Sequence, residues 1–149
     1  MYAYDMRATD NAQLFSEKAA QIVNKQTPMD VATIERVKKA LANKGVALEQ
    51  SPELDKWLLS KNAEAITFSD STIVMHTKVS ASGFFEELIH YGQLKNKRAV
   101  FGDFENNLLL EIEAKERLLR YRKAYKITDY EVEVLTEVLD RYKIQLEIL

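Results

Sequence analysis

The sequence contains no cysteine, which excludes disulfide bonds, thiolate nucleophiles and the cysteine-rich zinc sites. A positive charge balance is also lacking: the formal net charge is −2 at pH 7, which gives no broad positive field for nucleic acid or an anionic membrane surface. Long apolar runs are absent, and Met1-Tyr2-Ala3-Tyr4-Asp5 lacks the basic-then-apolar order of a signal peptide. We therefore expect no nucleic-acid partner and no membrane segment.

The residues that are present suffice for one ordinary domain. Of the 149 residues, 46% are hydrophobic and 30% are charged, enough for one buried core with little room for a second. Apolar residues spaced three and four apart predict amphipathic helices. The expected helices span about residues 9–24, 28–44, 52–58, 84–94, 106–125 and 129–146.

Capping residues mark where these helices are expected to begin. Thr27 and Ser51 each precede a proline, which favours the first position of a helix. Ser82 is the expected cap of the helix over 84–94, and Thr128 forms a capping box with Glu131. These signals predict the starts of four helices.

A β-hairpin is the clearest strand signal. Residues 65–68 and 72–77 are rich in β-branched and apolar side chains, and the turn-forming Ser69-Asp70-Ser71 lies between them. Val46 to Leu48 is a candidate short strand. The sequence thus predicts a mostly helical α+β domain with a small antiparallel sheet that precedes the helix over 84–94.

The most distinctive motif, Glu86-Glu87-Leu88-Ile89-His90, lies on that helix. Residues four apart share a helix face, so Glu86 and His90 project together with Glu87 beside them. In the metallopeptidase motif His-Glu-x-x-His, two histidines bind zinc and the glutamate deprotonates the bound water. The pattern makes Glu86 and His90 candidate zinc ligands, with a carboxylate replacing the first histidine, and Glu87 the candidate general base.

A three-ligand site needs another donor, and the next long helix offers Glu111, Glu113 and Glu116. A cationic residue follows each of them four positions later, so ion pairs on the helix surface also explain all three. On a helical wheel, however, Glu111 falls between two apolar arcs, whereas Glu113 neighbours Arg117 and Arg120. We therefore expect Glu111 to be more buried than Glu113.

The segment Glu111-Ile112-Glu113-Ala114-Lys115 resembles the third-ligand motif of the gluzincin peptidases, Glu-x-x-Ala followed by Asp or Asn. Glu111 lies 21 residues after His90, a spacing that suits that group, and hairpin, motif helix and glutamate helix follow in the zincin order. The resemblance implies that Glu111 is a metal ligand. It also implies that the strand over 72–77 is the edge strand that pairs with an extended peptide.

A narrower resemblance covers residues 44–126, with Ser80-Ala81-Ser82-Gly83-Phe84-Phe85 directly before the motif. This stretch is similar to C-terminal domains of phage head-morphogenesis proteins and bacterial polymorphic toxins, which are described as zincin-like toxins. The resemblance divides the single domain, residues 1–149, into an N-terminal helical part (1–43), a zincin-like core (44–126) and a C-terminal helix (127–149).

The resemblance implies a zinc-dependent peptidase that acts as a toxin or effector domain on a peptide or protein substrate, with an immunity protein as its neutralising partner. Such a domain would act in the cytoplasm or be delivered as part of a larger exported or phage protein.

Two departures from the gluzincin pattern compensate each other in charge. Glu86 replaces the first ligand histidine, and Lys115 replaces the Asp or Asn that supports this histidine. An aspartate beside Glu86 would repel it, whereas Lys115 attracts it. Lys115 could therefore orient a ligating carboxylate, or it could neutralise Glu86 in a salt bridge that replaces the metal.

Two alternatives to the enzyme stay open. The first is a metal-free, zincin-derived pseudoenzyme that serves as a protein-binding module. The second takes Glu87 and His90 as the Glu-x-x-His half-site of a di-iron bundle. A dimer would have to complete that site, because His76, which we expect to be exposed on the hairpin, has no glutamate three residues before it.

Overall fold

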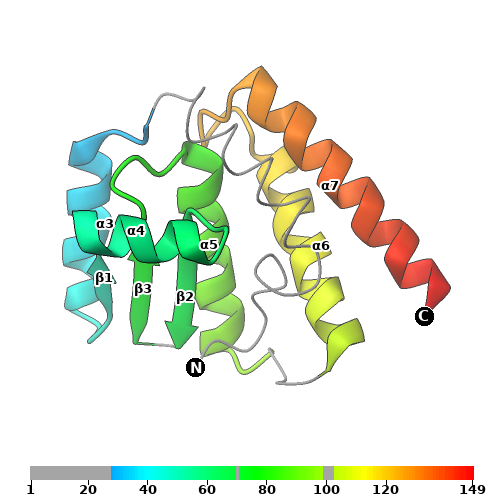
Figure 1. Cartoon of the computed structure of the whole chain (residues 1–149), viewed down its shortest axis with the longest axis horizontal. Coiled ribbons are helices and arrows are strands. Elements are labelled where there is room, and N and C mark those ends of the chain that lie inside the picture. The colour runs from blue at the N-terminus through cyan, green and yellow to red at the C-terminus, as the bar shows by residue number, and fades with distance from the viewer. Residues whose placement is uncertain (1–27, 70, 99–102) are drawn as a thin grey trace.

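The computed structural model describes residues 28–69, 71–98 and 103–149, so the helix expected over 9–24 and the expected cap Thr27 lie outside the described residues. Figure 1 shows a small sheet beside a set of helices. The fold is α+β and mostly helical, as predicted. In chain order the elements are α3 (Val31–Ala42), β1 (Ala47–Glu49), α4 (Pro52–Ser60), β2 (Ala65–Ser69), β3 (Thr72–Met75), α5 (Ala81–Lys95), α6 (Phe104–Arg120) and α7 (Asp129–Ile148).

The sheet has the strand order β1-β3-β2. The expected hairpin is confirmed, with β2 antiparallel to β3, and the short strand predicted near Val46 is also present as β1. Because β1 pairs with β3 in parallel, the sheet is mixed rather than purely antiparallel. The prediction that the strand over 72–77 is an edge strand is wrong, since β1 covers the outer side of β3.

Alternating side chains place the sheet between helices on both faces. Leu58 of α4 packs with Ile66 and Val74 on one face, and α4 crosses in front of the strands in Figure 1. Neighbouring residues of the strands point the other way, as the twofold alternation of a strand requires. On that second face the core joins α3 and α5 to the sheet through Ile34, Leu41, Leu48, Ile73, Met75 and Phe84.

Helix α6 lies between α5 and α7 in Figure 1. Leu108 and Ile112 of α6 pack against Val138 and Tyr142 of α7 in a separate apolar cluster. The side of α6 that faces α5 is instead polar where Glu111 and Lys115 project. No helix among the described residues has the length and apolar character needed to span a bilayer.

The helix caps follow the predictions at two places and differ at two. Ser51 caps α4 and Thr128 forms its capping box at α7. Asp30, rather than Thr27, caps α3, because the Asp30 carboxylate accepts the N–H of Thr33 at 2.8 Å. Helix α6 also ends at Arg120, five residues before the predicted end at 125, and a turn follows.

Ser80, rather than Ser82, caps α5, because the Ser80 hydroxyl accepts the N–H of Gly83 at 3.1 Å. Two buried carboxylates bind this end of the helix. Glu64 accepts the N–H and hydroxyl of Ser80 at 2.9 and 3.0 Å, and Glu131 of α7 accepts the N–H of Ser82 at 2.9 Å. We call these five residues the α5 N-terminal cluster.

Candidate functional site

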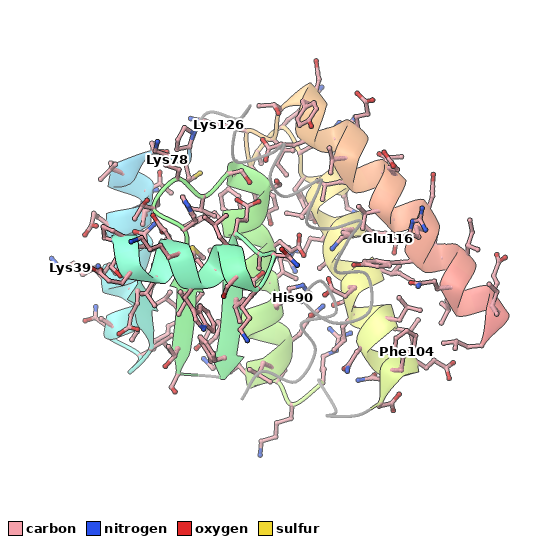
Figure 2. The ribbon with its side chains drawn as sticks, viewed as in Figure 1. Lys39, Lys78, His90, Phe104, Glu116 and Lys126 are labelled. Carbon is pink, nitrogen blue, oxygen red and sulfur yellow. The ribbon has the colours of Figure 1, made fainter. Side chains whose placement is uncertain are left out.

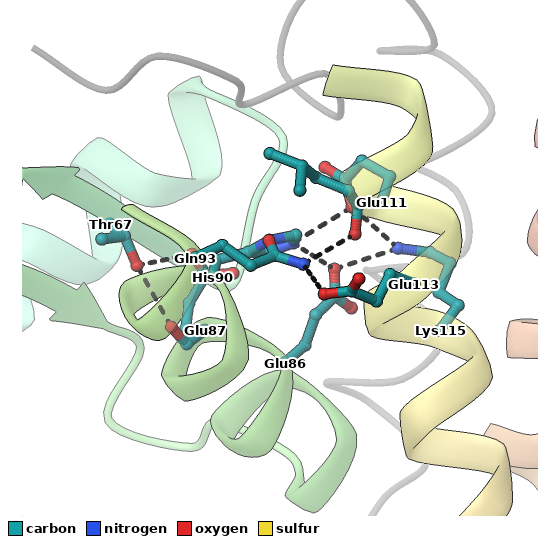
Figure 3. A network of polar contacts seen from close by, with 9 residues as sticks. Thr67, Glu86, Glu87, His90, Gln93, Glu111, Glu113 and Lys115 are labelled. Atoms are coloured by element: carbon teal, nitrogen blue, oxygen red, sulfur yellow. Dashed lines mark hydrogen bonds and ion pairs between the residues drawn. The ribbon is translucent and has the colours of Figure 1, made fainter. Parts of the chain in front are cut away.

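The motif residues lie at the middle of α5, where this helix faces α6. Glu86 and His90 project from one face of α5 toward Glu111 and Lys115, which lie one turn apart on α6 (Figure 3). Figure 2 shows His90 between these two helices. Each of the four residues is at most 3% exposed. We call them the central cluster.

Lys115 binds both carboxylates of the central cluster. Its Nζ donates to Glu86 Oε2 at 3.0 Å and to Glu111 Oε1 at 3.1 Å. His90 Nε2 faces the same two oxygens, at 3.1 Å from Glu111 Oε1 and 3.4 Å from Glu86 Oε2. The Lys115 ammonium also lies 5.3 Å from the centre of the Tyr142 ring of α7, a cation–π contact. The prediction that Lys115 pairs with Glu86 is confirmed.

Gln93 determines the protonation of the other nitrogen of His90. The Gln93 amide nitrogen donates to the carbonyl of Leu110 at 3.1 Å and to Glu113 at 3.0 Å, which leaves its oxygen to face His90 Nδ1 at 2.8 Å. Since that oxygen only accepts, Nδ1 carries a proton. Nε2 faces carboxylate oxygens, which also accept, so the contacts of His90 are those of an imidazolium with two N–H donors.

The charges agree with this geometry. Burial by itself would lower the pKa of His90, but the charge of Glu111 and the hydrogen bonds that His90 donates to Glu111 and Glu86 outweigh burial and raise it to about 10. Burial would raise the pKa of Glu111, yet the charges of Lys115 and His90 lower it to about 2. Both groups are therefore charged at neutral pH.

The central cluster has the ligands of a metal site. The ligand atoms of Glu86, His90 and Glu111 all lie within 4.8 Å of one another, so these residues could hold a metal ion. One imidazole and two carboxylates are donors that zinc accepts at about 2.0–2.2 Å. The Lys115 ammonium, however, already bonds to two of the three donors. A metal would fit only after Lys115 had moved and His90 Nε2 had lost its proton.

Glu87, the expected general base, is 2% exposed and has a different partner. The hydroxyl of Thr67 on β2 donates to Glu87 Oε1 at 3.0 Å. In Figure 3 the Glu87 side chain points toward Thr67, away from Lys115. Glu87 and His90 thus face different partners, an arrangement that does not resemble a Glu-x-x-His half-site in which both residues bind one iron.

The other glutamates of α6 lie outside the cluster. Glu113 forms a two-pronged ion pair with Arg98 at 2.7 and 2.6 Å, and Glu116 pairs with Lys143 at 3.3 Å. The side chain of Glu113 is 45% exposed and that of Glu111 is 1% exposed, so the prediction that Glu111 is the more buried is confirmed.

Sequence reasoning missed Gln93 and Thr67, and it placed His76 wrongly. Gln93 lies three residues after His90, and this spacing on one helix face was the available signal. Thr67 carries no such signal, since its contact with Glu87 joins a strand to a helix. His76 is buried just after the end of β3. Its Nδ1 accepts the N–H of Lys78 at 2.9 Å, and its Nε2 lies 3.7 Å from Asp55.

Comparisons with protein-family models, with curated proteins and with solved structures found no match to this chain. The contacts and charges of the central cluster are therefore the basis for a function.

Proposed function

We propose that this chain is a zincin-derived, metal-free domain that serves as a protein-binding module, with the Lys115 ammonium in place of the metal ion. The observation that carries the proposal is the pair of bonds from Lys115 Nζ to Glu86 and Glu111, at 3.0 and 3.1 Å. The residues expected as carboxylate ligands are thereby bound to a cation that the chain itself supplies.

Charge balance supports this proposal. The two carboxylates of Glu86 and Glu111 face one ammonium and one imidazolium, so the charges of these four residues balance without an added ion, and Glu87 beside them accepts the hydroxyl of Thr67. A divalent metal would require a neutral His90 and a new place for the Lys115 charge. Moving an ammonium out of a buried pair into an apolar interior costs several kcal/mol, so the metal-free state is favoured.

The position of Glu87 supports it too. A general base in a zinc peptidase must reach the water bound to the metal. The Glu87 carboxylate instead accepts the hydroxyl of Thr67, and both side chains are buried. Its partner thus holds Glu87 toward the sheet rather than toward the ligands.

A metal-dependent hydrolase, a peptidase acting as a toxin or effector, is the second candidate, because three donor atoms within 4.8 Å of one another favour it. Glu86, His90 and Glu111 would hold zinc, which would activate water and polarise the scissile carbonyl. Glu87 would have to leave Thr67 to act as the base. Gln93, which holds the Nδ1 proton of His90, already leaves Nε2 directed at the ligand position.

Zinc titration by isothermal calorimetry separates the two candidates. Wild-type protein should show no stoichiometric binding, whereas Lys115→Met should gain a site, because the substitution removes the competing cation and leaves both carboxylates. Lys143→Met is the matched control, since Lys143 is half exposed and also pairs with a glutamate of α6. Stoichiometric zinc binding by the wild type, abolished in His90→Ala, would overturn the metal-free proposal and support the hydrolase.

A further inference from the structure

Helix α5 is apolar on two faces. Phe84 and Tyr91 are buried on the face that meets the sheet. Phe85, Leu88 and Ile89 lie on a second face, where each side chain is only partly buried. Leu88 and Ile89 follow Phe85 by three and four residues, the spacing of a helix side that packs against another element. The described part of the chain therefore covers this second face incompletely.

A groove with a volume of about 400 Å³ runs along this second face of α5. Its other wall is α6, which lies beside α5 in Figure 1 and contributes Glu113 and Arg117. Gly92 leaves the groove open along α5, because a Cβ at this position would meet no described atom within 4 Å. Tyr125 lies at one end of the groove, where its ring stacks on Phe85 with ring centres 4.2 Å apart.

The groove has a positive rim. Arg98 binds Glu113, the only acidic residue in the described lining, through two bonds of 2.7 and 2.6 Å. Arg117 forms no ion pair within the described residues, and its guanidinium lies 5.9 Å from the centre of the Tyr121 ring. Four exposed cationic residues of the segments that flank the two ends add to this charge: Lys95, Lys97, Arg122 and Lys123.

The walls of the groove favour a helical occupant. Both walls are helices, whose backbone N–H and C=O groups bond within each helix. An extended segment would therefore find no strand edge to pair with, whereas a helix satisfies its own backbone groups. From residue 85 to residue 96 the groove is about 16 Å long, which is about three helical turns.

We propose that this groove binds an acidic amphipathic helix of a partner protein. The inference deepens the proposed binding function and rests on it, because it names the surface that binds and the chemistry of the partner. Apolar side chains three and four residues apart on the partner helix would cover Leu88 and Ile89, and one would enter the space above Gly92. Acidic side chains at the edge of that helix would face Arg117 and the other cations of the rim.

A second copy of this chain suits the groove less well than an acidic partner does. A twofold interface repeats every contact, so two copies that met through this face would bring the rim cations of each against those of the other. Like charges placed together in this way disfavour the complex.

The central cluster holds the two walls of the groove together. Lys115 of α6 bonds to Glu86 of α5 at 3.0 Å. Gln93 lines the groove, and its side chain bonds to His90 of the same helix and to Glu113 of α6. The cluster therefore fixes the spacing between α5 and α6, and a bound helix should be detected at the ring of His90 through Gln93.

A phage-displayed library of helical peptides as long as α5, 15 residues, tests this inference. Leucine occupies every third or fourth position of each peptide, and the other positions vary between glutamate and lysine. Peptides selected on the wild-type chain should be rich in glutamate at the positions that flank the leucines. Addition of a selected peptide should shift the His90 ring signals in an NMR spectrum.

Two pairs of variants locate the binding. Gly92→Trp fills the groove, and Leu109→Trp is its matched control, because Leu109 is 45% exposed on α6 and does not line the groove. In fluorescence anisotropy, the selected peptide should bind the first variant at least about tenfold more weakly than the second. Arg117→Gln removes a rim cation, and Arg120→Gln is its control in the same last turn of α6. Here the expected difference is about two- to fivefold.

A library that yields no binder, selected peptides rich in lysine, or equal binding within the tryptophan pair or within the glutamine pair would overturn the inference. Self-association of the wild type that Gly92→Trp abolishes would assign the groove to a second copy and would also overturn it. So would NMR contacts in the free chain between Ile89 and residues 9–24, the expected helix outside the described residues. Zinc titration does not depend on this groove, so a failure here is distinguishable from a failure of the metal-free proposal.

Discussion

Helix α5 binds buried carboxylates at two places, and the two places neutralise them differently. In the α5 N-terminal cluster both carboxylates accept hydrogen bonds from backbone N–H groups, and serine or threonine hydroxyls add to them. In the central cluster both carboxylates accept bonds from Lys115 and lie against His90. The described partners of the first cluster are thus N–H and hydroxyl groups, whereas the second cluster has two cationic side chains.

The difference follows from position along the helix. The first turn of a helix has unpaired N–H groups and the positive end of the helix dipole, which together stabilise an anion. In the middle of α5 the backbone N–H groups are paired within the helix, so the buried carboxylates there depend on side-chain partners. Glu87 accepts the hydroxyl of Thr67, whereas Glu86 accepts the ammonium of Lys115. Whether a lysine or a metal is the cation at Glu86 decides the function.

The largest expected effect comes from removing that cation. Lys115→Met should lower the free energy of unfolding by about 3–5 kcal/mol, because the buried carboxylates of Glu86 and Glu111 would keep His90 as a cationic partner but lose Lys115. The control Lys143→Met should cost less than about 1 kcal/mol, since its ion pair with Glu116 is half exposed. Urea denaturation measures both losses. Equal losses in the two variants would show that Lys115 does not stabilise the cluster.

Gly83→Ala breaks the other cluster. A Cβ at Gly83 would lie 2.5 Å from Cδ of Glu64, so the carboxylate must leave Ser80. We expect a loss of about 1–3 kcal/mol. Gly92→Ala is the control on the same helix, because a Cβ there meets no described atom within 4 Å. Alanine favours a helix over glycine, so this substitution should raise the free energy of unfolding by as much as about 1 kcal/mol. Thermal unfolding measures both changes, and a change of the same sign in both variants would contradict the predicted clash with Glu64.

Alkaline pH should weaken the central cluster. The pKa of His90 is raised from its ordinary value of 6.5 to about 10 in the folded chain, so its stabilisation is complete below pH 6.5 and is lost as the pH rises toward 10. The slope should be at most about 1.4 kcal/mol per pH unit. Urea midpoints from pH 6 to 10 should fall in the wild type and stay flatter in His90→Gln. Parallel curves would assign the loss to other groups.

Acid should weaken the same cluster through Glu111. The folded-state pKa of Glu111, about 2, lies below its ordinary value of 4.5, so this stabilisation is complete above pH 4.5 and is lost as the pH falls toward 2. The contributions of His90 and Glu111 are therefore both complete between pH 4.5 and 6.5.

The smallest effect is expected at the solvent end of the central cluster. Arg98→Gln removes the ion pair with Glu113, in which both side chains are nearly half exposed, and should cost less than about 1 kcal/mol. The amide nitrogen of Gln93 donates to the carbonyl of Leu110 as well as to Glu113. Gln93 should therefore stay in place when the ion pair is lost, and the ring of His90 should keep its orientation. The His90 ring protons in an NMR spectrum report this directly, and a large shift would show that the surface pair positions His90.

Local features were predictable from the sequence to the extent that neighbouring residues determine them. The capping box at Thr128 and the cap at Ser51 involve residues three positions apart, and both are present as expected. The sequence predicted Ser82 as the cap of α5, whereas Ser80 is the cap, because both are serines in the same short segment. What separates them is Glu64 and Glu131, which are distant in sequence and bind the two serines differently.

Each half of the central cluster was predictable from helical spacing within a short segment, whereas the meeting of His90 with Glu111 was expected from the gluzincin resemblance. Glu86 and His90 are four residues apart, as are Glu111 and Lys115, and the apolar arcs beside Glu111 indicated its burial. The parallel pairing of β1 with β3 was not predictable, since it joins residues near 47 to residues near 72 and carries no local signal. That pairing is what makes β3 central.

The same pairing has a consequence for the order of folding. Strands β2 and β3 are neighbours in sequence and form a hairpin, a step that takes about 1–10 μs in isolation. Strand β1 reaches β3 only after a much longer loop has closed, which costs more chain entropy. We therefore expect β1 to join the sheet last and to leave it first, and protection of the Ala47 amide to appear after that of the hairpin.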